Sequence, residues 1–288
     1  MMNVAIIGGG RLGTCLGRAL AAHGYPVAAV SCRTLRSARE SVRLIGQGAA
    51  MTDNARAAAR GRLVFLCLPD DVIAGVARRV AAAERDWTGR VVFHTSGLQP
   101  ASVLAPFRAR GAVVGSFHPA QSFPAKDASL SLFRGITFAL EGDPEIRTTG
   151  GRIVRRLGGQ VLWLTAGDKP LYHAACSLAS NGLAVLLDTA FDLLASLGLD
   201  RPAAGEVLLP LSQGTLQNVK KTDPRRALTG PVLRGDAGTV ERHLESLRRH
   251  PGALEVYRTL AGQALRAARE RGLAAARLKA LRRSLGDG

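Results

Sequence analysis

The sequence predicts an α/β domain built on a doubly wound, mostly parallel sheet, followed by an all-helical domain. Two features of the 288-residue chain support this prediction. Over about the first 165 residues, short β-rich runs alternate with helical stretches, which is typical of a sheet covered by helices on both faces. Beyond Leu164 the strand runs stop, and apolar residues recur at spacings of three and four, as helices require. We therefore expect one domain over 1–166 and a second over 167–288.

The expected elements of the first domain are short and follow one another closely. Strands are predicted at 3–7, 27–31, 63–68, 91–94, 113–116, 136–140 and 161–164. Helices fit between most of them, at 11–23, 35–44, 71–83 and 101–108. In the second domain, prolines divide the sequence into several helices, because proline starts or interrupts a helix. These prolines are Pro202, Pro210, Pro224, Pro231 and Pro251.

The charge of the chain is strongly positive, which raises the question of a nucleic-acid partner. The chain has 39 Lys and Arg against 22 Asp and Glu, a net charge of +17, and clustered cations can neutralise phosphates. Only five of the 39 are lysines, and aromatic residues make up 5% of the chain, which leaves few platforms for stacking bases. We expect arginine-rich solvated faces and one phosphate pocket rather than nucleic-acid binding, with a polyanion partner as the alternative.

The cysteines indicate a reducing compartment. The chain has four cysteines, which lie far apart in the sequence and form no C-x-x-C pair. This spacing fits neither a disulfide framework nor a zinc site. They are Cys15, Cys32, Cys67 and Cys176. The N-terminus leads directly into an apolar strand without a basic leader or cleavage site. We expect a cytoplasmic protein without a bound metal.

One later stretch, 178–197, is apolar enough to suggest a membrane span. It is interrupted by Asn181, Asp188 and Asp192, whereas a span needs ~20 mostly apolar residues. The sequence therefore predicts a buried helix of a soluble protein and no membrane.

A glycine-rich turn near the N-terminus predicts a dinucleotide site. Gly8, Gly10 and Gly13 form a G-x-G-x-x-G turn, with Arg11 and Leu12 inside it, between an apolar strand and a helix. The first glycine permits the tight turn, the second lets the backbone approach a pyrophosphate, and the third allows close helix–sheet packing. The phosphates would lie at the helix N-terminus, where amide donors are free. An ordinary strand–helix turn is the alternative.

The end of the second strand predicts NADP rather than NAD. NAD-binding proteins usually carry an acid here for the ribose hydroxyls, but the run is Ser31-Cys32-Arg33-Thr34. Arg33, with Ser31, Thr34 and Arg36, can meet a 2′-phosphate, for which a planar guanidinium is well suited. A surface arginine at a helix start is the alternative.

Three further strand ends supply candidate residues at the edge where ligands gather in open α/β sheets. Leu68 and Pro69 would pass beside the cofactor, while Asp70 or Asp71 would cap the next helix. His94 and His118 follow the next two strands. A histidine ring at the end of an apolar strand needs a partner if it is buried, so we expect His94 at the cofactor and His118 in catalysis.

For Ser96 we expect a structural role rather than a catalytic one. The run from Ser96 to Gln99 has the sequence pattern of a capping box.

The first helix of the second domain carries a polar stripe. Lys169, His173, Ser177 and Asn181 follow one another at intervals of four, so they drift slowly round one face. In a carbonyl or imine reductase such a group polarises the acceptor and supplies a proton after hydride transfer. We name Lys169, His173 and Asn181 as catalytic candidates, and a polar seam that serves packing alone as the alternative.

The segment 227–236 is the other unusual part of the second domain. Thr229 and Arg234 could reach a substrate, and Arg234 could clamp a carboxylate through bidentate geometry. Asp236 is expected to cap the helix that follows. A solvated loop arginine is the alternative for Arg234.

Taken together, these motifs resemble a known bacterial family. They are GGGRLG, LCLPDDVI, HTSG, SFHPAQSF, FALEGD, the K-x-x-YH…SN set, LLPL…GTLQN and ALTGPVLRGD. The chain resembles, over nearly its whole length, candidate NADP oxidoreductases that pair a Rossmann-like domain with a domain of unknown function. That helical domain is similar to the C-terminal part of 6-phosphogluconate dehydrogenase. The resemblance implies a dinucleotide-binding fold and a homodimer through the helical domain.

More distant relatives include pyrroline-5-carboxylate reductase, ketopantoate reductase and hydroxyisobutyrate dehydrogenase. The hydroxyacid dehydrogenases among them carry a K-x-x-x-N pair on the equivalent helix. Here Lys169 matches but His173 replaces the asparagine, so that catalytic assignment transfers only in part.

The leading hypothesis is an NADP-dependent oxidoreductase, acting on CH–OH or C=N groups, that reduces a small keto acid or imine by hydride transfer. Ketopantoate-like substrates are a secondary suggestion. A non-catalytic dinucleotide-binding or redox-sensing protein is the alternative class, because a fold alone does not prove activity.

Overall fold

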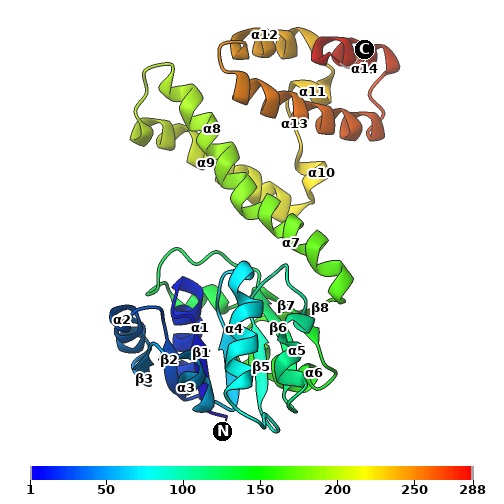
Figure 1. The fold of residues 1–288 in the computed structure, drawn as a ribbon. Coiled ribbons are helices and arrows are strands. Elements are labelled where there is room, and N and C mark those ends of the chain that lie inside the picture. The colour runs from blue at the N-terminus through cyan, green and yellow to red at the C-terminus, as the bar shows by residue number, and fades with distance from the viewer. Residues whose placement is uncertain (1, 287–288) are drawn as a thin grey trace. The chain divides into compact units, whose positions relative to one another are not determined.

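A computed structural model describes residues 2–286 of the chain (Figure 1). Contacts divide the chain into two units, Met1–Leu178 and Ala179–Gly288. The division falls later than the expected boundary at residue 166, because the first helix of the expected second domain belongs with the sheet. Lys169 on that helix is fully buried against residues of the sheet unit.

The first unit is built on one eight-stranded sheet with the order β3-β2-β1-β4-β5-β6-β7-β8. Every neighbouring pair is parallel except β6 and β7, so the predicted mostly parallel sheet is confirmed. The strands are β1 Val4–Ile7, β2 Val27–Ser31, β3 Ala49–Met51, β4 Leu63–Leu66, β5 Val91–His94, β6 Val113–Pro119, β7 Thr137–Gly142 and β8 Gln160–Trp163.

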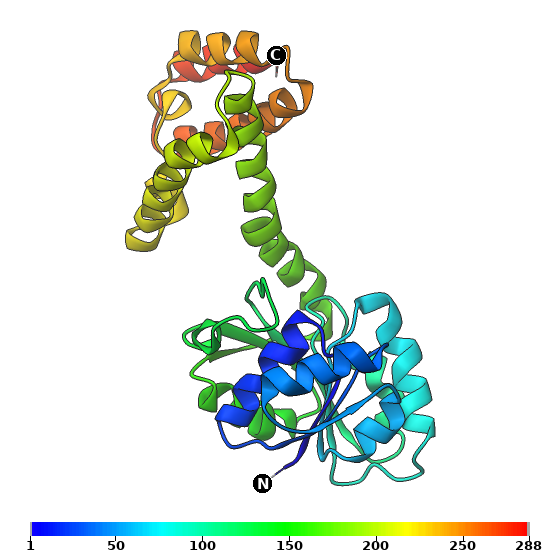
Figure 2. The same ribbon diagram turned by 90° about the vertical axis from the view of Figure 1, so that its left-hand side faces the viewer.

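Helices cover both faces of this sheet (Figures 1 and 2). On one face lie α1 Arg11–Ala22, α2 Leu35–Ile45 and α6 Ile146–Arg156, and on the other lie α3 Asn54–Ala59, α4 Asp70–Ala82 and α5 Ala105–Arg108. The remaining helical segments of the unit are the short 3-10 helices η1 Ala101–Leu104, η2 Leu130–Phe133 and η3 Ala166–Asp168, and then α7 Lys169–Ser177. Strand β3 and helices α3 and α6 were not predicted.

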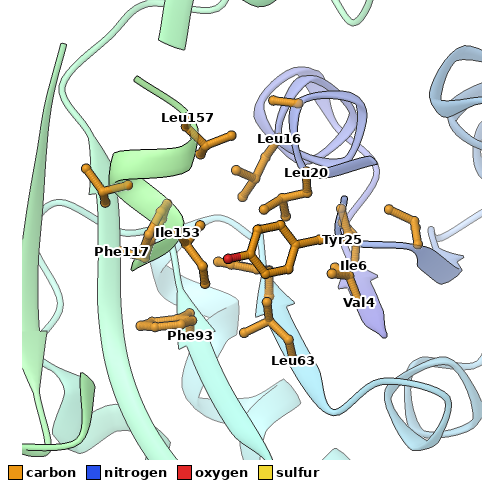
Figure 3. Close-up of a cluster of buried hydrophobic side chains, with 14 of the residues drawn as sticks. Val4, Ile6, Leu16, Leu20, Tyr25, Leu63, Phe93, Phe117, Ile153 and Leu157 are labelled. Carbon is orange, nitrogen blue, oxygen red and sulfur yellow. The ribbon is translucent and has the colours of Figure 1, made fainter. Parts of the chain in front are cut away.

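The buried core follows the period of two that a strand imposes. In β1, Val4 and Ile6 point to one face, while Ala5 and Ile7 point to the other. Figure 3 shows the first face, where Val4 and Ile6 meet side chains of α1 and α6. The sheet is therefore buried on both faces, which explains why its strands are continuous apolar runs.

The second unit is entirely helical over the residues that the structure describes. After a π-helical turn at Leu178–Gly182, its helices are α8 Leu183–Ala195, α9 Arg201–Lys221, α10 Pro224–Ala227, α11 Pro231–Arg234, α12 Ala237–Leu247, α13 Pro251–Glu270 and α14 Ala275–Leu285. Its apolar core comes from α11 to α14 and consists of Val232, Val240, Leu244, Ala261, Leu265, Leu281 and Leu285. Helices α8 and α9 contribute only Ala204 to the fully buried side chains.

The predicted buried helix over 178–197 is wrong for the single chain. Leu178 is 75% exposed, Val185 64% and Leu197 73%. By length and composition alone, the helical stretch Ala166–Ala195 could cross a membrane, a test that core helices also pass. Apolar composition predicts that a face is covered, but it does not say that the same chain covers it.

Candidate active site

The glycine turn has the shape that the sequence predicts. Gly8 has a φ of +103°, and a Cβ there would meet the Cys67 carbonyl. A Cβ on Gly13 would meet the Gly8 carbonyl, whereas one on Gly10 would have open space around it. Two of the glycines are thus required by packing, and the third leaves room over the start of α1, where the first amides are free to bind an anion.

A cleft of about 330 Å³ opens at the carboxyl ends of the central strands. It brings together predicted residues from the glycine turn, the end of β4, the end of β6 and α7. These are Gly10, Arg11, Leu12, Gly13, Leu68, Pro69, His118 and His173. Prediction did not include seven further lining residues: Cys67, Asp70, Thr95, Ser96, Gly97, Pro119 and Gln121. The candidate phosphate turn and two candidate catalytic histidines therefore share one cavity.

Gly97 is the point where the two histidines meet the backbone. A Cβ on Gly97 would lie 2.5 Å from Cδ2 of His173 and 2.9 Å from Nε2 of His118. The two imidazole rings have centroids 5.9 Å apart. Only a glycine lets both rings approach the turn, and Nε2 of His118 is the ring nitrogen that faces it.

His118 is paired with Tyr172, a residue that sequence reasoning did not single out as a site. Nδ1 of His118 lies 2.9 Å from the phenol oxygen of Tyr172. Burial, with the nearby Lys169 and His173, lowers the pKa of His118 to about 4, and burial raises the pKa of Tyr172. At neutral pH the phenol can donate to Nδ1, which leaves the imidazole proton on Nε2. Tyr172 follows Lys169 by three residues, so the helical spacing could have predicted that it lies on the same side of the helix as Lys169.

Lys169 lies beneath the cleft rather than in it. Its side chain is fully buried, and the cleft lining does not include it. Nζ donates to Oγ of Ser116 at 2.6 Å and to the Ser96 carbonyl at 3.2 Å. Burial lowers the pKa of Lys169 to about 8. Its direct catalytic role stays a prediction.

His94 and Ser31 are also enclosed by protein. His94 is fully buried: its Nδ1 accepts from the Ser96 amide at 3.2 Å, and Nε2 lies 3.3 Å from the Pro100 carbonyl. Burial lowers the pKa of His94 to about 3. The Ser31 hydroxyl donates to Oδ1 of Asn54 at 2.8 Å. His94 therefore supports the turn that lines the cleft, and Ser31 supports the end of β2.

The start of α2 leaves its basic side chains exposed. Arg33 and Arg36 are both exposed, and Oγ1 of Thr34 caps the helix by accepting from the Ser37 amide at 3.2 Å. The two arginines are thus available to an anion at a capped helix start.

The remaining predicted side chains lie in the second unit. Asn181 lies in the π-helical turn and is exposed, and its catalytic role stays a prediction, as do the substrate roles of Thr229 and Arg234. The predicted cap at Asp236 is confirmed, because Oδ1 accepts from the Thr239 amide at 3.1 Å.

Two predicted caps in the first unit differ from the structure. The predicted cap at Asp70 or Asp71 is wrong: Pro69 is the cap residue of α4 and the acids occupy its first turn, where they face the helix dipole favourably. Oγ of Ser96 does accept from the Leu98 and Gln99 amides, but it closes a turn and no α-helix follows directly.

Two family descriptions match the two parts of the chain. Residues 1–119 match the Rossmann-like domain, and residues 136–264 match a domain of unknown function, DUF2520. The chain carries a Rossmann-like domain followed by a DUF2520 domain. The second match begins at the last two strands of the sheet and so crosses the division between the two units.

Solved structures are similar over nearly the whole chain. A candidate NADP oxidoreductase from Bacteroides fragilis is 25% identical, covers 91% of this chain and 97% of its own, and has a TM-score of 0.76. The Thermotoga maritima protein TM1727 is 26% identical, with coverage of 93% and 99% and a TM-score of 0.70. A reductive aminase from Aspergillus terreus, solved with NADPH and ethyl-5-oxohexanoate, is 19% identical, with coverage of 100% and 95% and a TM-score of 0.61. No curated protein matches the sequence. The fold is shared with NAD(P)-dependent oxidoreductases.

Proposed function

We propose that this protein is an NADPH-dependent reductase of a small carbonyl or imine substrate. The observation that carries the proposal is the single cleft that holds the phosphate-binding turn together with His118 and His173. A cofactor site beside groups that can move a proton is what hydride-transfer chemistry requires. The similarity to a candidate NADP oxidoreductase supports the same class.

The residues present fit an NADP cofactor. The amides at the start of α1, with open space over Gly10, suit a pyrophosphate. Arg33 and Arg36 suit a 2′-phosphate at the start of α2. A cavity lined by Leu35, Met51 and Arg56 lies next to that helix start and could take the adenine. When bound, NADPH supplies the hydride.

The side chains in the cleft supply the proton. In the favoured tautomer, His118 holds a proton on Nε2 beside Gly97, and Tyr172 holds one toward Nδ1. As the substrate carbon gains a hydride, its oxygen or nitrogen takes the Nε2 proton, the Tyr172 proton moves to Nδ1, and water replaces the phenol proton in the same step. His118 and Tyr172 therefore both stay neutral, as the burial that raises the pKa of Tyr172 requires. His173, on the other side of Gly97, orients the substrate.

The experiment has two stages. Saturable NADPH binding, measured by the fluorescence of the reduced nicotinamide, should be tighter than NADH binding. Absorbance of NADPH should then fall with a panel of small keto acids and cyclic imines. Binding without turnover over such a panel would favour the alternative, a dinucleotide sensor, and absence of saturable binding to both cofactors would exclude both functions.

A second histidine–tyrosine pair gives a matched control. His243 and Tyr257 in the second unit have the same 2.9 Å contact and the same 86° angle between rings as His118 and Tyr172, but they lie outside the cleft. His118→Gln should reduce turnover by about 10²-fold or more, the range of general acid catalysis, while NADPH binding persists. His243→Gln should leave both unchanged. Equal turnover in the two variants would rule out His118 as the proton donor.

The exposed apolar faces of α8 and α9 lead us to propose a homodimer. Val185, Leu197 and Leu211 are each more than 60% exposed, and burying such side chains contributes about 1.5–3 kcal/mol each. A second copy is the partner that we propose, rather than a bilayer, because Asp188 and Asp192 on α8 pair with Arg201. Light scattering should give twice the chain mass, and a monomer at working concentration would contradict the proposal.

The cysteines support a proposal of cytoplasmic location. All four are free thiols, which suits a reducing compartment. Fractionation of the native host should place the protein in the soluble cytoplasm.

A further inference from the structure

The most unusual charged group in the first unit is the ammonium of Lys169. It is fully buried, and no carboxylate among residues 2–286 lies within ion-pair distance of it. Burying a charge without a close counter-charge is costly. Its nearest carboxylates, Glu141 and Asp70, act on it only at longer range. Because burying this charge costs free energy, we expect Lys169 to have a functional role.

One partner of Lys169, Ser96, belongs to the cleft wall, and the other, Ser116, lies behind it. Nζ donates to the Ser96 carbonyl and to Oγ of Ser116, and the Ser116 hydroxyl itself donates to the same carbonyl at 3.2 Å. Ser96 precedes Gly97, against which both histidines pack, and Ser116 lies two residues before His118 on β6. Through these hydrogen bonds, the Lys169 ammonium holds the start of α7 against the turn after β5 and the end of β6.

The helix transmits this anchoring to the proton-donating pair. Tyr172 and His173 follow Lys169 by three and four residues on α7, so they lie on the same side of the helix one turn further along. Fixing the start of α7 on the strands therefore sets the distance from Tyr172 to His118.

We infer that Lys169 is a positioning residue, which fixes the Ser96–Gly97 turn and the His118–Tyr172 pair from beneath the cleft without touching the substrate. The inference rests on the proposed reductase function and names how its proton-donating group is held. It differs from a direct catalytic role, because the amine does not line the cleft.

The charge of Lys169 adds an electrostatic effect to the geometric one. The titratable groups around His118 are Lys169, His173, Tyr172 and His94, and the carboxylates that act on Lys169 are Glu141 and Asp70. The nearby cation disfavours a second positive charge on the imidazole. Burial is the larger cause of the lowered His118 pKa, and the Lys169 cation adds to it. Together they keep His118 neutral, with Nδ1 free to accept from Tyr172.

The test follows the titration of His118 by NMR of the imidazole carbons, with assignment from His118→Gln. In the native protein His118 should titrate near pH 4, because burial and the neighbouring cation both disfavour its charged form. An unchanged His118 pKa in Lys169→Gln would overturn the inference. Lys169→Gln removes the charge but keeps an amide donor, and should raise the His118 pKa by at least about one pH unit. Lys169→Met removes the donor as well, and Lys169→Arg, which retains the charge, should restore the low value.

Lys279→Met supplies the surface control, since Lys279 is exposed on α14. It should change neither the His118 titration nor the unfolding temperature. Circular dichroism shows whether each Lys169 variant folds. If Lys169→Met does not fold, Lys169→Gln and Lys169→Arg still separate charge from packing. Failure of all three variants to fold would overturn the inference, because Lys169 would then be needed for the fold itself rather than for placing the His118–Tyr172 pair.

Kinetics distinguish positioning from direct chemistry. Lys169→Gln should lower kcat by about 10- to 100-fold, the scale of a misplaced catalytic group, and shift the acid limb of its pH profile upward together with the His118 pKa. Abolished turnover with an unchanged His118 titration would assign Lys169 a direct role and overturn the inference. The titration and NADPH binding need no substrate, so they can succeed or fail separately from the proposed function.

Discussion

The two units of this chain bury their apolar side chains to very different degrees. In the sheet unit, every residue of β1, β4 and β5 is buried, and the rings of Phe65, Phe93, Phe117 and Phe138 contact one another at 5.0–5.4 Å. In the second unit, α8 has no buried residue and α9 has one. Both segments are rich in leucine and valine. Amino-acid composition therefore does not distinguish apolar segments that the chain buries itself from apolar segments that it leaves exposed.

The two units also differ in where their polar and charged side chains lie. Of the eight buried polar side chains among residues 2–286, five gather at the sheet edge around the Thr95–Gly97 turn: His94, Thr95, Ser96, Ser116 and Lys169. The ion pairs of the second unit lie at its surface instead, as with Arg225 and Glu270. Surface pairs contribute little, whereas enclosed groups that remain satisfied indicate a prepared site.

The largest difference between the two regions should appear on truncation of a single apolar side chain. Phe117→Ala removes a fully buried ring that contacts three others, and should lower the free energy of unfolding by about 3–5 kcal/mol. Leu211→Ala, at 67% exposure, should cost little in the free monomer. Urea unfolding at a dilution that yields monomers measures both. Equal losses would mean that α9 is covered within its own chain.

The next largest difference between the units should be the loss of stability at acid pH. The sheet unit holds His94 and His118 with pKa values of about 3 and 4 against an ordinary 6.5. The unfolded chain therefore binds protons that the folded chain does not, so stability falls as pH drops below 6.5. At pH 5.5 the loss should be about 1.4 kcal/mol for each histidine.

Urea unfolding at pH 7 and 5.5 measures this loss. His94→Phe and His118→Gln should each reduce the pH dependence, and His243→Gln in the second unit should not. An unchanged dependence in the first two variants would show that other groups cause it.

A smaller effect tests the cofactor end of the sheet unit. Arg33→Asp replaces a donor to a 2′-phosphate with an acid that suits ribose hydroxyls. NADPH binding should weaken by about 10- to 100-fold, since a charge-assisted hydrogen bond contributes about 1.5–3 kcal/mol, while NADH binding holds or improves. Arg85→Asp, an exposed arginine of this unit that lines neither the cleft nor the cavity beside α2, is the control. Parallel loss of both cofactors would place the 2′-phosphate elsewhere.

Sequence reasoning recovered most of the sheet unit because its signals are local. Apolar strands followed by a glycine turn or a polar turn specify the order and direction of the strands. The strand β3 and helix α3 were missed because Ala49–Ala59 is rich in alanine and small residues, which give no clear period of two or of 3.6. Helix α6 contains Gly150 and Gly151, and the close packing of Gly150 against Leu140 and Phe93 overrides the low helix propensity of glycine.

The site was recovered in part, for a related reason. Residues at strand ends or just after them, such as His118 and Pro69, can be predicted from topology alone. Whether a polar side chain faces the cleft or the protein depends on partners far along the chain. Lys169 binds Ser96 and Ser116, and Ser31 binds Asn54, and no spacing in the sequence predicts these contacts.

The smallest expected effect concerns helix starts, where the two regions should behave alike. Asp200 caps α9 by accepting from the Ala203 amide at 2.9 Å, and Asp53 caps α3 by accepting from Ala55 and Arg56. Alanine at either position should cost about 1 kcal/mol, because a free helix amide loses its acceptor. Asn, which keeps the acceptor, should restore most of the loss in chemical unfolding. Capping is a contact within one helix turn, so a much larger loss at Asp200 would mean that the start of α9 also takes part in the interface that covers its apolar face.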